Sequence, residues 1–316
     1  MTLDRQKLST YSLLERPSKV TIADFSQPLT GRENISEFID KLPDILGGLD
    51  LKEIITVAYQ AFSSGKLIML GMGAHVVKVG LAPMLIPLLE SGVLQGIAMN
   101  GAGIIHDFEI AFAGKTSEDV SEVLGAGNFG MARETGQHLN EAINKGAENG
   151  WGLGYAIGHF INHEKLPHRD KSIVATCHRL DIPLTVHVAI GTDIIHMHPE
   201  ADGAAIGATS MKDFRTFCEL VAGLDQGVYF NVGSAVILPE VFLKALSLAH
   251  NLGRQVNGLT TVAIDFVRQY RVMENVVKRP TMESGKGYYL IGQHEILLPL
   301  LIAGILARLD QPTNKE

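Results

Sequence analysis

The sequence predicts a three-layer, doubly wound α/β fold with a mostly parallel sheet of about six strands. Three observations predict it. Short apolar runs alternate with amphipathic helical stretches, and several of the runs end in glycine-containing turns. Hydrophobic residues make up 46% of the 316 residues and charged residues only 19%, which is enough apolar material for a sheet buried on both faces.

The chain divides into an arm and one domain. Residues 1–32 show no clear hydrophobic period, and we expect them to form an N-terminal arm that docks on the domain or on a neighbouring subunit. Residues 33–316 are predicted to form a single α/β nucleotide-binding domain, without an internal repeat or a linker. Strands are expected over 66–70, 93–99, 182–189, 227–232, 259–266 and 287–291. Helices are expected over 35–46, 51–62, 76–89, 211–222, 239–252 and 293–308.

Charge and composition narrow the class of partner. The net charge of −7 argues against nucleic acid or an anionic membrane as the main partner. The longest apolar stretch, 296–307, is too short to cross a membrane, and the N-terminus lacks the apolar region of a signal peptide. Two cysteines without a pairing pattern favour a reducing compartment. We therefore expect a cytoplasmic, soluble protein.

Two turns with small residues mark a candidate cofactor site. Gly71-Met72-Gly73 and Asn100-Gly101-Ala102-Gly103 each end a predicted strand and lead toward a helix. Small residues there would admit a dinucleotide, and helix N-terminal amides would attract its phosphates. The alternative is that both are tight turns whose glycines need a positive φ. Neither turn is a full GxGxxG, so a Rossmann-like pose need not follow that of ordinary dehydrogenases.

The segment from Leu70 to Asp107 resembles the deoxyhypusine synthase family. Both contain, in the same order, a strand ending in Leu-Gly, a helix, a second strand, a small-residue turn and an acidic residue. No insertion separates the two turns. Weaker similarity extends over roughly 33–307. The resemblance implies an NAD-dependent transferase that oxidises an amine, captures the imine fragment on a lysine and passes it to an acceptor. It also implies a homo-oligomer, a dimer or a tetramer.

The resemblance assigns roles to particular residues. Lys286 would be the catalytic lysine, and Ala74 and His75 would contact the cofactor where the family has Ser-Asn. Asp107 would contact the substrate. The two glutamates that precede it in the family are replaced by Ile105 and His106, which removes counter-charges for a polyamine, so a small amine other than spermidine is expected.

Other polar residues near predicted strand ends complete this site. Asp193 would orient the amine or hold a ribose hydroxyl, and Asp265 could hold the cofactor in the same way. His106, or else His75, could act as general base, because an imidazole titrates near neutral pH. For the two aspartates, helix capping is the structural alternative.

A histidine cluster supports a rival hypothesis. His187, His196 and His198 lie close to Asp193 in the sequence, and a strand over 196–198 would point two rings to one side. Such a set could bind zinc or another divalent metal for a hydrolase reaction. A third hypothesis is a non-catalytic nucleotide-binding protein.

Overall fold

A computed structural model of the chain describes residues 4–309 and contains one six-stranded sheet. Every strand pairs in parallel with its neighbours, in the order β3-β2-β1-β4-β5-β6. The predicted doubly wound α/β class is therefore confirmed. The strands are β1 (Ile68–Met72), β2 (Gly96–Asn100), β3 (Leu184–His187), β4 (Val228–Val232), β5 (Leu259–Asp265) and β6 (Gly285–Ile291).

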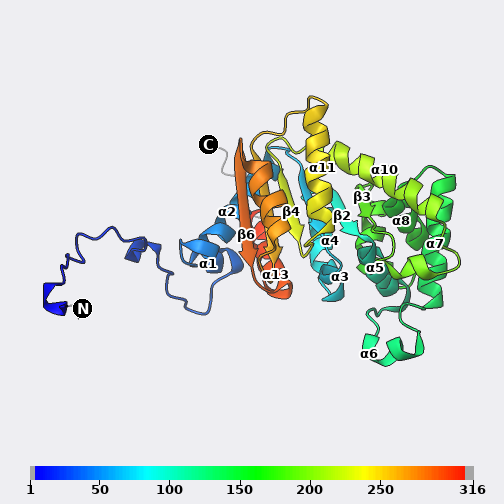
Figure 1. Ribbon diagram of the computed structural model, residues 1–316, viewed down its shortest axis with the longest axis horizontal. Helices are drawn as coiled ribbons and strands as arrows, with labels where there is room; N and C mark the ends of the chain where they lie inside the picture. Colours follow the sequence, from blue (N-terminus) through cyan, green and yellow to red (C-terminus); the bar gives the residue numbers. More distant parts are fainter. Residues whose placement is uncertain (1–3, 310–316) are drawn as a thin grey trace.

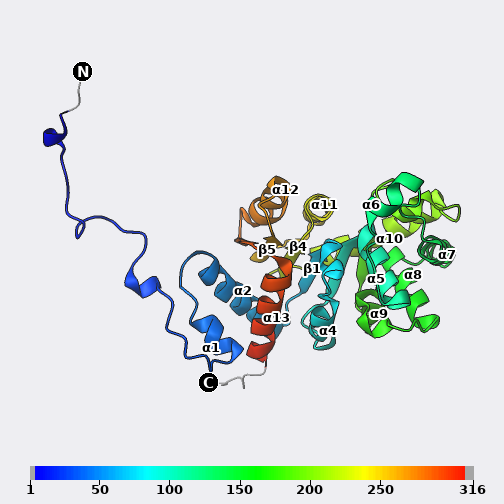
Figure 2. The ribbon, with the colours of Figure 1, turned by 90° about the horizontal axis from the view of Figure 1, so that it is seen from below.

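Helices cover both faces of this sheet (Figures 1 and 2). The longer ones are α1 (Ile35–Asp40), α2 (Leu46–Ser63), α4 (Ala82–Glu90), α5 (Gly101–Ala113), α7 (Arg133–Glu148), α8 (Leu153–His163), α9 (Ile173–Arg179), α10 (Gly203–Ala222), α11 (Ile237–Asn251) and α13 (His294–Leu309). The short ones are α3 (His75–Lys78), α6 (Val120–Val123) and α12 (Tyr270–Val272).

Alternate side chains of the strands build two separate cores. Leu70 of β1 and Phe230 of β4 belong to the core that includes residues of α2, α4 and α13. Met69 and Tyr229, one position away, belong to the core formed with α11 and the second half of α10. A strand places successive side chains on opposite faces, so this division is what a three-layer arrangement requires.

The strand order places the carboxyl ends of all six strands at one edge of the sheet. β1 lies between β2 and β4, so the chain order reverses direction beside β1. In open α/β sheets, ligands bind at this carboxyl edge, near the point of reversal. The turns after β1 and β2 lie side by side there, as the sequence predicted, because β1 and β2 are neighbours.

The helix that follows β2 is well capped at both ends. The side chain of Asn100 accepts a hydrogen bond from the Gly103 N–H at 3.1 Å, and Gly114 ends α5 at a φ of 68°. Both are common ways to satisfy the unpaired backbone groups of a helix end. These caps fix the start of α5 at the carboxyl edge.

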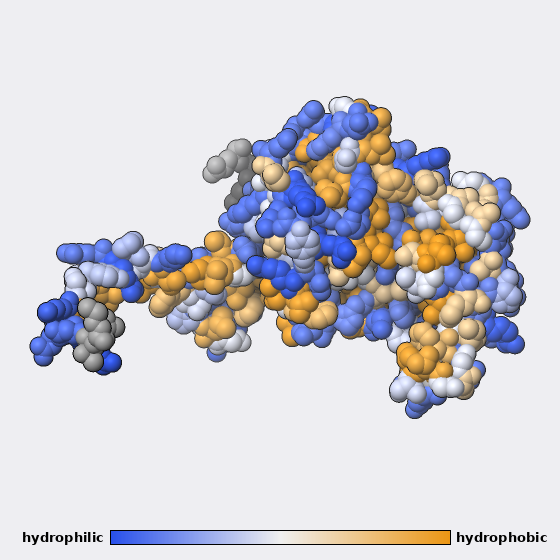
Figure 3. Space-filling model, viewed as in Figure 1, coloured by the Kyte–Doolittle hydropathy of each residue, from blue (hydrophilic) through white to orange (hydrophobic). Residues whose placement is uncertain are grey.

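The segment before α1 runs away from the layers (Figures 1 and 2). Its side chains include several exposed large apolar ones, such as Leu14 and Ile22, and Figure 3 shows apolar surface along it. The docking of this arm on a second subunit stays a prediction, as do the domain boundary at 32/33 and the homo-oligomer. No helix among residues 4–309 is both long enough and apolar enough to span a membrane.

The strand predicted around 196–198 is wrong. The sequence suggested strand structure around 196–198, but β3 ends at His187 and a 3-10 helix, η5 (Ile194–Met197), follows the loop. His196 lies in this helix and His198 follows it, so the two residues are not alternate positions of one strand.

Candidate functional site

A cavity of about 320 Å³ lies at the carboxyl ends of β2 and β3. One wall is the first half of α5, another is the segment 117–132, and a third is the loop that joins β3 to η5. Its polar side chains come from these walls and from α3, which supplies Lys78. They are Lys78, His106, Glu109, Ser117, Glu118, Thr192 and Asp193.

Two polar side chains of this cavity, His106 and Glu109, are joined by hydrogen bonds through Thr116. The hydroxyl of Thr116 donates to Oε2 of Glu109 at 2.5 Å, and Nδ1 of His106 lies 2.6 Å from the same hydroxyl oxygen. A threonine hydroxyl has one proton, which is used on Glu109, so its oxygen accepts from His106. The Nδ1 of His106 therefore holds the proton, and the lone pair of a neutral ring lies on Nε2.

The second oxygen of Glu109 is also fixed. Oε1 accepts a hydrogen bond from the hydroxyl of Thr135 in α7 at 3.0 Å. Burial by itself would raise the pKa of Glu109, but the nearby His106 ring, 3.8 Å from Oε2, and the hydrogen bonds from Thr116 and Thr135 outweigh burial and hold the pKa below its usual value. The carboxylate is thus charged at neutral pH and stabilises a positive charge on His106.

Asp193 lies on the opposite wall and is only 6% exposed. Its Oδ2 atom has no hydrogen-bond partner among the described residues. Burial raises the pKa of Asp193 to about 6, although the backbone groups of Ala189 and Ala102 partly offset the effect. A buried carboxylate with an unpartnered oxygen is costly unless a ligand completes it.

Internal contacts explain the small residues of the two predicted cofactor turns. A Cβ added at Gly73 would lie 2.1 Å from the carbonyl oxygen of Gly233, and one at Gly101 would lie 2.1 Å from Oδ2 of Asp193. At Gly71, a Cβ would lie 2.3 Å from the Tyr229 hydroxyl. None of these three glycines has a positive φ, so the tight-turn alternative is wrong. They are needed because protein atoms approach the backbone closely.

The remaining predicted cofactor residues lie at the same edge, with different exposure. Ala102 lines the cavity, whereas Asn100 caps α5. Ala74 precedes α3, and His75 is exposed with its ring centroid 5.5 Å from that of the buried His294. Asp265 ends β5, is buried, and accepts a hydrogen bond from the Phe266 N–H at 2.8 Å.

The predicted substrate role of Asp107 is wrong. Its side chain is completely buried on the other face of α5, where it accepts hydrogen bonds from the Ser172 hydroxyl and from the backbone N–H groups of Ile173 and Val174. Burial raises its pKa to about 6, and these hydrogen bonds act in the opposite direction. Asp107 therefore holds the start of α9 against α5 and cannot reach a ligand.

Lys286 lies far from the cavity in the sheet. It pairs with Thr260 near the beginning of β6 and β5, at the amino edge. Its Nζ is 2.6 Å from Oε2 of Glu53, and this hydrogen bond raises the pKa of Lys286. A lysine nucleophile must be a free amine, which needs a lowered pKa. The structure therefore does not bring Lys286 together with His106 and Asp193.

The three histidines of the metal hypothesis are not brought together. His187 bonds Thr185 through Nε2 at 3.1 Å, and His198 bonds the carbonyl of Gly130 at 2.8 Å. His196 accepts a hydrogen bond from the Gly191 N–H. Within residues 4–309, no group of three or more His, Cys, Asp or Glu side chains is placed to hold a metal ion. The cluster in the sequence is thus dispersed by the loop and the 3-10 helix.

Sequence reasoning missed Lys78 and Glu109, which line the cavity, and Thr116, which joins Glu109 to His106. The signal for Glu109 was present, because it lies three positions after His106 and so shares its helix face. Thr116 and Lys78 had no such signal, since a loop and a neighbouring helix bring them there.

The architecture and the position of the cavity define a doubly wound α/β protein with a candidate ligand site at the carboxyl edge. No protein-family model matches the sequence, and no curated protein matches it. Solved structures do share the fold, and three of them follow.

ArgZ, an arginine dihydrolase from cyanobacteria, aligns at a TM-score of 0.52 with 19% identity over 84% of this chain and 32% of its own. AgrE in a ternary complex with ornithine and NAD⁺ aligns at 0.54 with 14% identity, over 85% of this chain and 35% of its own. A protein from Entamoeba histolytica described as a deoxyhypusine synthase aligns at 0.51 with 13% identity, over 87% of this chain and 94% of its own.

At these identities the similarity shows the fold alone. The chain spans about a third of the length of ArgZ and AgrE. The family that the sequence resembles is thus among the proteins that share this architecture.

Proposed function

We propose that this protein is an NAD-dependent enzyme that oxidises a small amine in the cavity beside α5. The proposal rests on the hydrogen bonds that link Glu109 through Thr116 to His106 and leave Nε2 of His106 as a proton acceptor. A base with a positioned carboxylate behind it is the arrangement used for general base catalysis.

The charges at the cavity favour a cationic substrate. Glu109, Glu118 and Asp193 contribute three carboxyl groups, and Lys78 contributes one ammonium group. An alkylammonium would be attracted by this excess of negative charge. The sequence hypothesis of an amine substrate is thus retained, with Glu109 and Glu118 in place of Asp107.

Two observations support NAD as the cofactor. The unpartnered Oδ2 of Asp193 suits a ribose hydroxyl, which is a common use of a carboxylate in dinucleotide-binding folds. AgrE, which shares the fold, has been solved with NAD⁺. Because Gly73 packs closely against Gly233, the cofactor would lie over the ends of β2 and β3 and not between the turns that follow β1 and β4.

The proposed reaction is a dehydrogenation. His106 takes a proton from the substrate ammonium at Nε2, which frees the nitrogen lone pair. Bound NAD would accept a hydride from the carbon next to this nitrogen, and the substrate would become an iminium ion. Glu109 stabilises the imidazolium through Thr116, and Asp193 orients the nucleotide or the amine.

Transfer of the imine fragment, as the family resemblance implies, needs a lysine that reaches the cavity. Lys78 lines the cavity, whereas Lys286 lies at the other edge. We therefore assign the transfer step to Lys78. Its Nζ, after giving up its proton to solvent, would attack the iminium carbon, and the original nitrogen would leave as an amine that takes the proton held by His106.

Calorimetric titration with NAD and an absorbance assay for NADH with a panel of small amines test the proposal. We expect saturable NAD binding, and NADH formation that depends on one class of amine and is lost in His106→Ala. Borohydride reduction should then attach the fragment to Lys78. Binding without turnover would identify a non-catalytic nucleotide-binding protein, and absence of NAD binding would overturn the proposal.

A further inference from the structure

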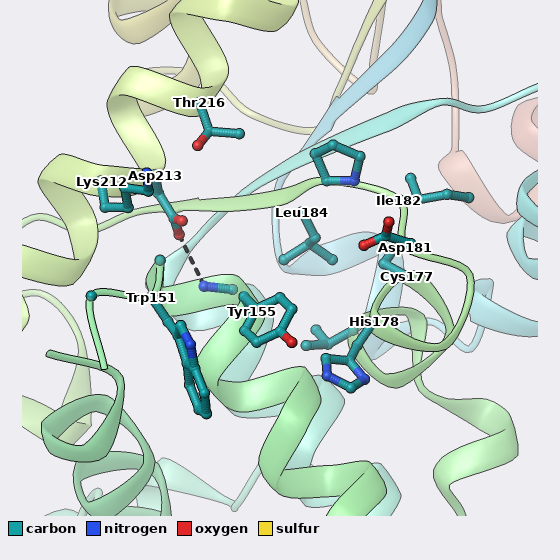
Figure 4. A pocket seen from close by; sticks show the side chains of 15 residues that line it. Trp151, Tyr155, Cys177, His178, Asp181, Ile182, Leu184, Lys212, Asp213 and Thr216 are labelled. Carbon is teal, nitrogen blue, oxygen red and sulfur yellow. Dashed lines mark hydrogen bonds between the residues drawn. The ribbon is translucent and has the colours of Figure 1, made fainter. Parts of the chain in front are cut away.

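A second cavity, of about 290 Å³, lies at the amino end of β3, at the opposite edge of the sheet from the first (Figure 4). The segment 181–184 enters β3 here, and α8, α9 and α10 supply the other walls. Nothing in the proposed reaction uses this cavity.

Aromatic rings form one side of it. Tyr155 lies between Trp151 and His178, with ring centroids 5.2 Å from the first and 4.8 Å from the second (Figure 4). Trp151 lies just before the N-cap of α8, and Tyr155 lies in the first turn of that helix. Tyr155 is exposed and the other two rings are half-buried, so each is accessible to a ligand, although the ring of His159 packs against all three.

Carboxyl groups form the other side. Asp213 extends from α10, and its Oδ2 accepts hydrogen bonds from the backbone N–H groups of Gly154 at 2.9 Å and Val186 at 2.8 Å. Asp181 lies at the mouth beside His178 (Figure 4). Lys212 is the one ammonium group that lines the cavity, and it is exposed.

No cation of the protein covers these rings within residues 4–309. The cation–π pairs found there are Arg268 with Tyr289 and Lys286 with Tyr288, both elsewhere. Burial lowers the pKa of His178, so its ring is neutral at physiological pH and does not repel a cation. Carboxyl groups disfavour an anion.

We propose that the Trp151–Tyr155–His178 cavity is a binding site for a small organic ammonium ion, held by its aromatic rings and by Asp181 and Asp213. Rings with negative π faces and nearby carboxylates are the usual surroundings of methylated and alkyl ammonium ions in proteins. The volume fits a head group of a few carbon atoms. The site is separate from the proposed amine-oxidation site and does not depend on it.

Trp151 is the only tryptophan of the chain, so its fluorescence reports on this cavity alone. Choline chloride is the cationic probe, 3,3-dimethylbutan-1-ol is its neutral analogue of the same shape, and sodium chloride controls for ionic strength. We expect a saturable fluorescence change with choline and an affinity for the alcohol that is weaker by roughly tenfold.

Two variants sharpen the measurement. Tyr155→Leu keeps apolar volume but removes the ring, and Asp181→Asn removes an exposed charge without disturbing the core. Both are expected to weaken choline binding severalfold, whereas His106→Ala at the other edge should leave it unchanged. Equal affinity for the alcohol, no saturable change with choline, or unchanged binding in both variants would overturn the proposal.

Discussion

Helix α5 presents two acidic side chains, two residues apart, to opposite surroundings. Asp107 is completely buried and accepts three hydrogen bonds from Ser172 and the start of α9. Glu109 lines the cavity and is bonded by Thr116 and Thr135. Successive helix positions differ by about 100°, so two positions place the side chains on nearly opposite faces. Asp107 thus maintains the fold, whereas Glu109 is positioned to take part in chemistry at the cavity.

The largest effect is expected at the cavity face. His106→Ala removes the proposed base and should lower amine-dependent NADH formation by roughly 10²–10⁴-fold. The free energy of unfolding should change little, because the side chain is only partly buried. Steady-state kinetics and urea denaturation measure the two quantities. His163→Ala, at an exposed histidine, is the control, and equal activity of the two variants would contradict the assignment.

The buried face of α5 should give the reverse pattern. Asp107→Ala leaves two backbone N–H groups and a hydroxyl without a partner in the interior, so a loss of about 3 kcal/mol of unfolding free energy is expected. Urea denaturation measures this loss. Glu109→Gln is the matched control and should cost far less stability but more activity. If Asp107→Ala were as stable as the wild type, the buried role would be refuted.

A pH titration extends the comparison to a second buried acid. Burial raises the pKa of Asp213 to about 7, above the ordinary value of an aspartate, so the folded protein binds this proton more tightly than the unfolded chain does. Its stabilising contribution is therefore complete at acid pH and is lost as the pH rises through 7.

The difference in unfolding free energy between the wild type and Asp213→Asn should fall by about 1 kcal/mol from pH 6 to pH 8. Comparison with the variant is needed because burial lowers the pKa of His187 to about 4, so this histidine destabilises the fold as the pH falls below its ordinary value. A difference that is constant with pH would show that Asp213 does not titrate in this range.

The smallest effect is expected at the amino edge. Lys286→Met breaks an ion pair with Glu53 that is largely exposed, so the loss of stability should be at most about 1 kcal/mol. The NAD-dependent activity should be unchanged within error. A loss of activity comparable to that of His106→Ala would return Lys286 to the site.

The sheet could be predicted from the sequence because buried parallel strands are continuous apolar runs. The run expected over 227–232 corresponds to β4, and the one expected over 259–266 corresponds to β5, each within one residue at either end. The run expected over 182–189 was too long, because apolar residues continue into the loop after His187. Apolar composition does not show at which residue a strand stops pairing with its neighbour.

The cavity was only partly predictable. His106 and Asp193 follow predicted strands and do line it, because the carboxyl edge collects such residues. Asp107 was selected by its place in a motif, and the motif does not specify which face of α5 is buried. Thr116 contacts His106 across a loop, a relationship that depends on tertiary structure and that spacing alone does not reveal.

Hydrogen exchange of the full chain with and without NAD tests most directly whether the carboxyl edge is the cofactor site. We expect NAD to protect backbone amides at the start of α5 and in the loop 189–198, and to leave the beginning of β6 around Lys286 unchanged. Protection at the amino edge with none at α5 would contradict the account.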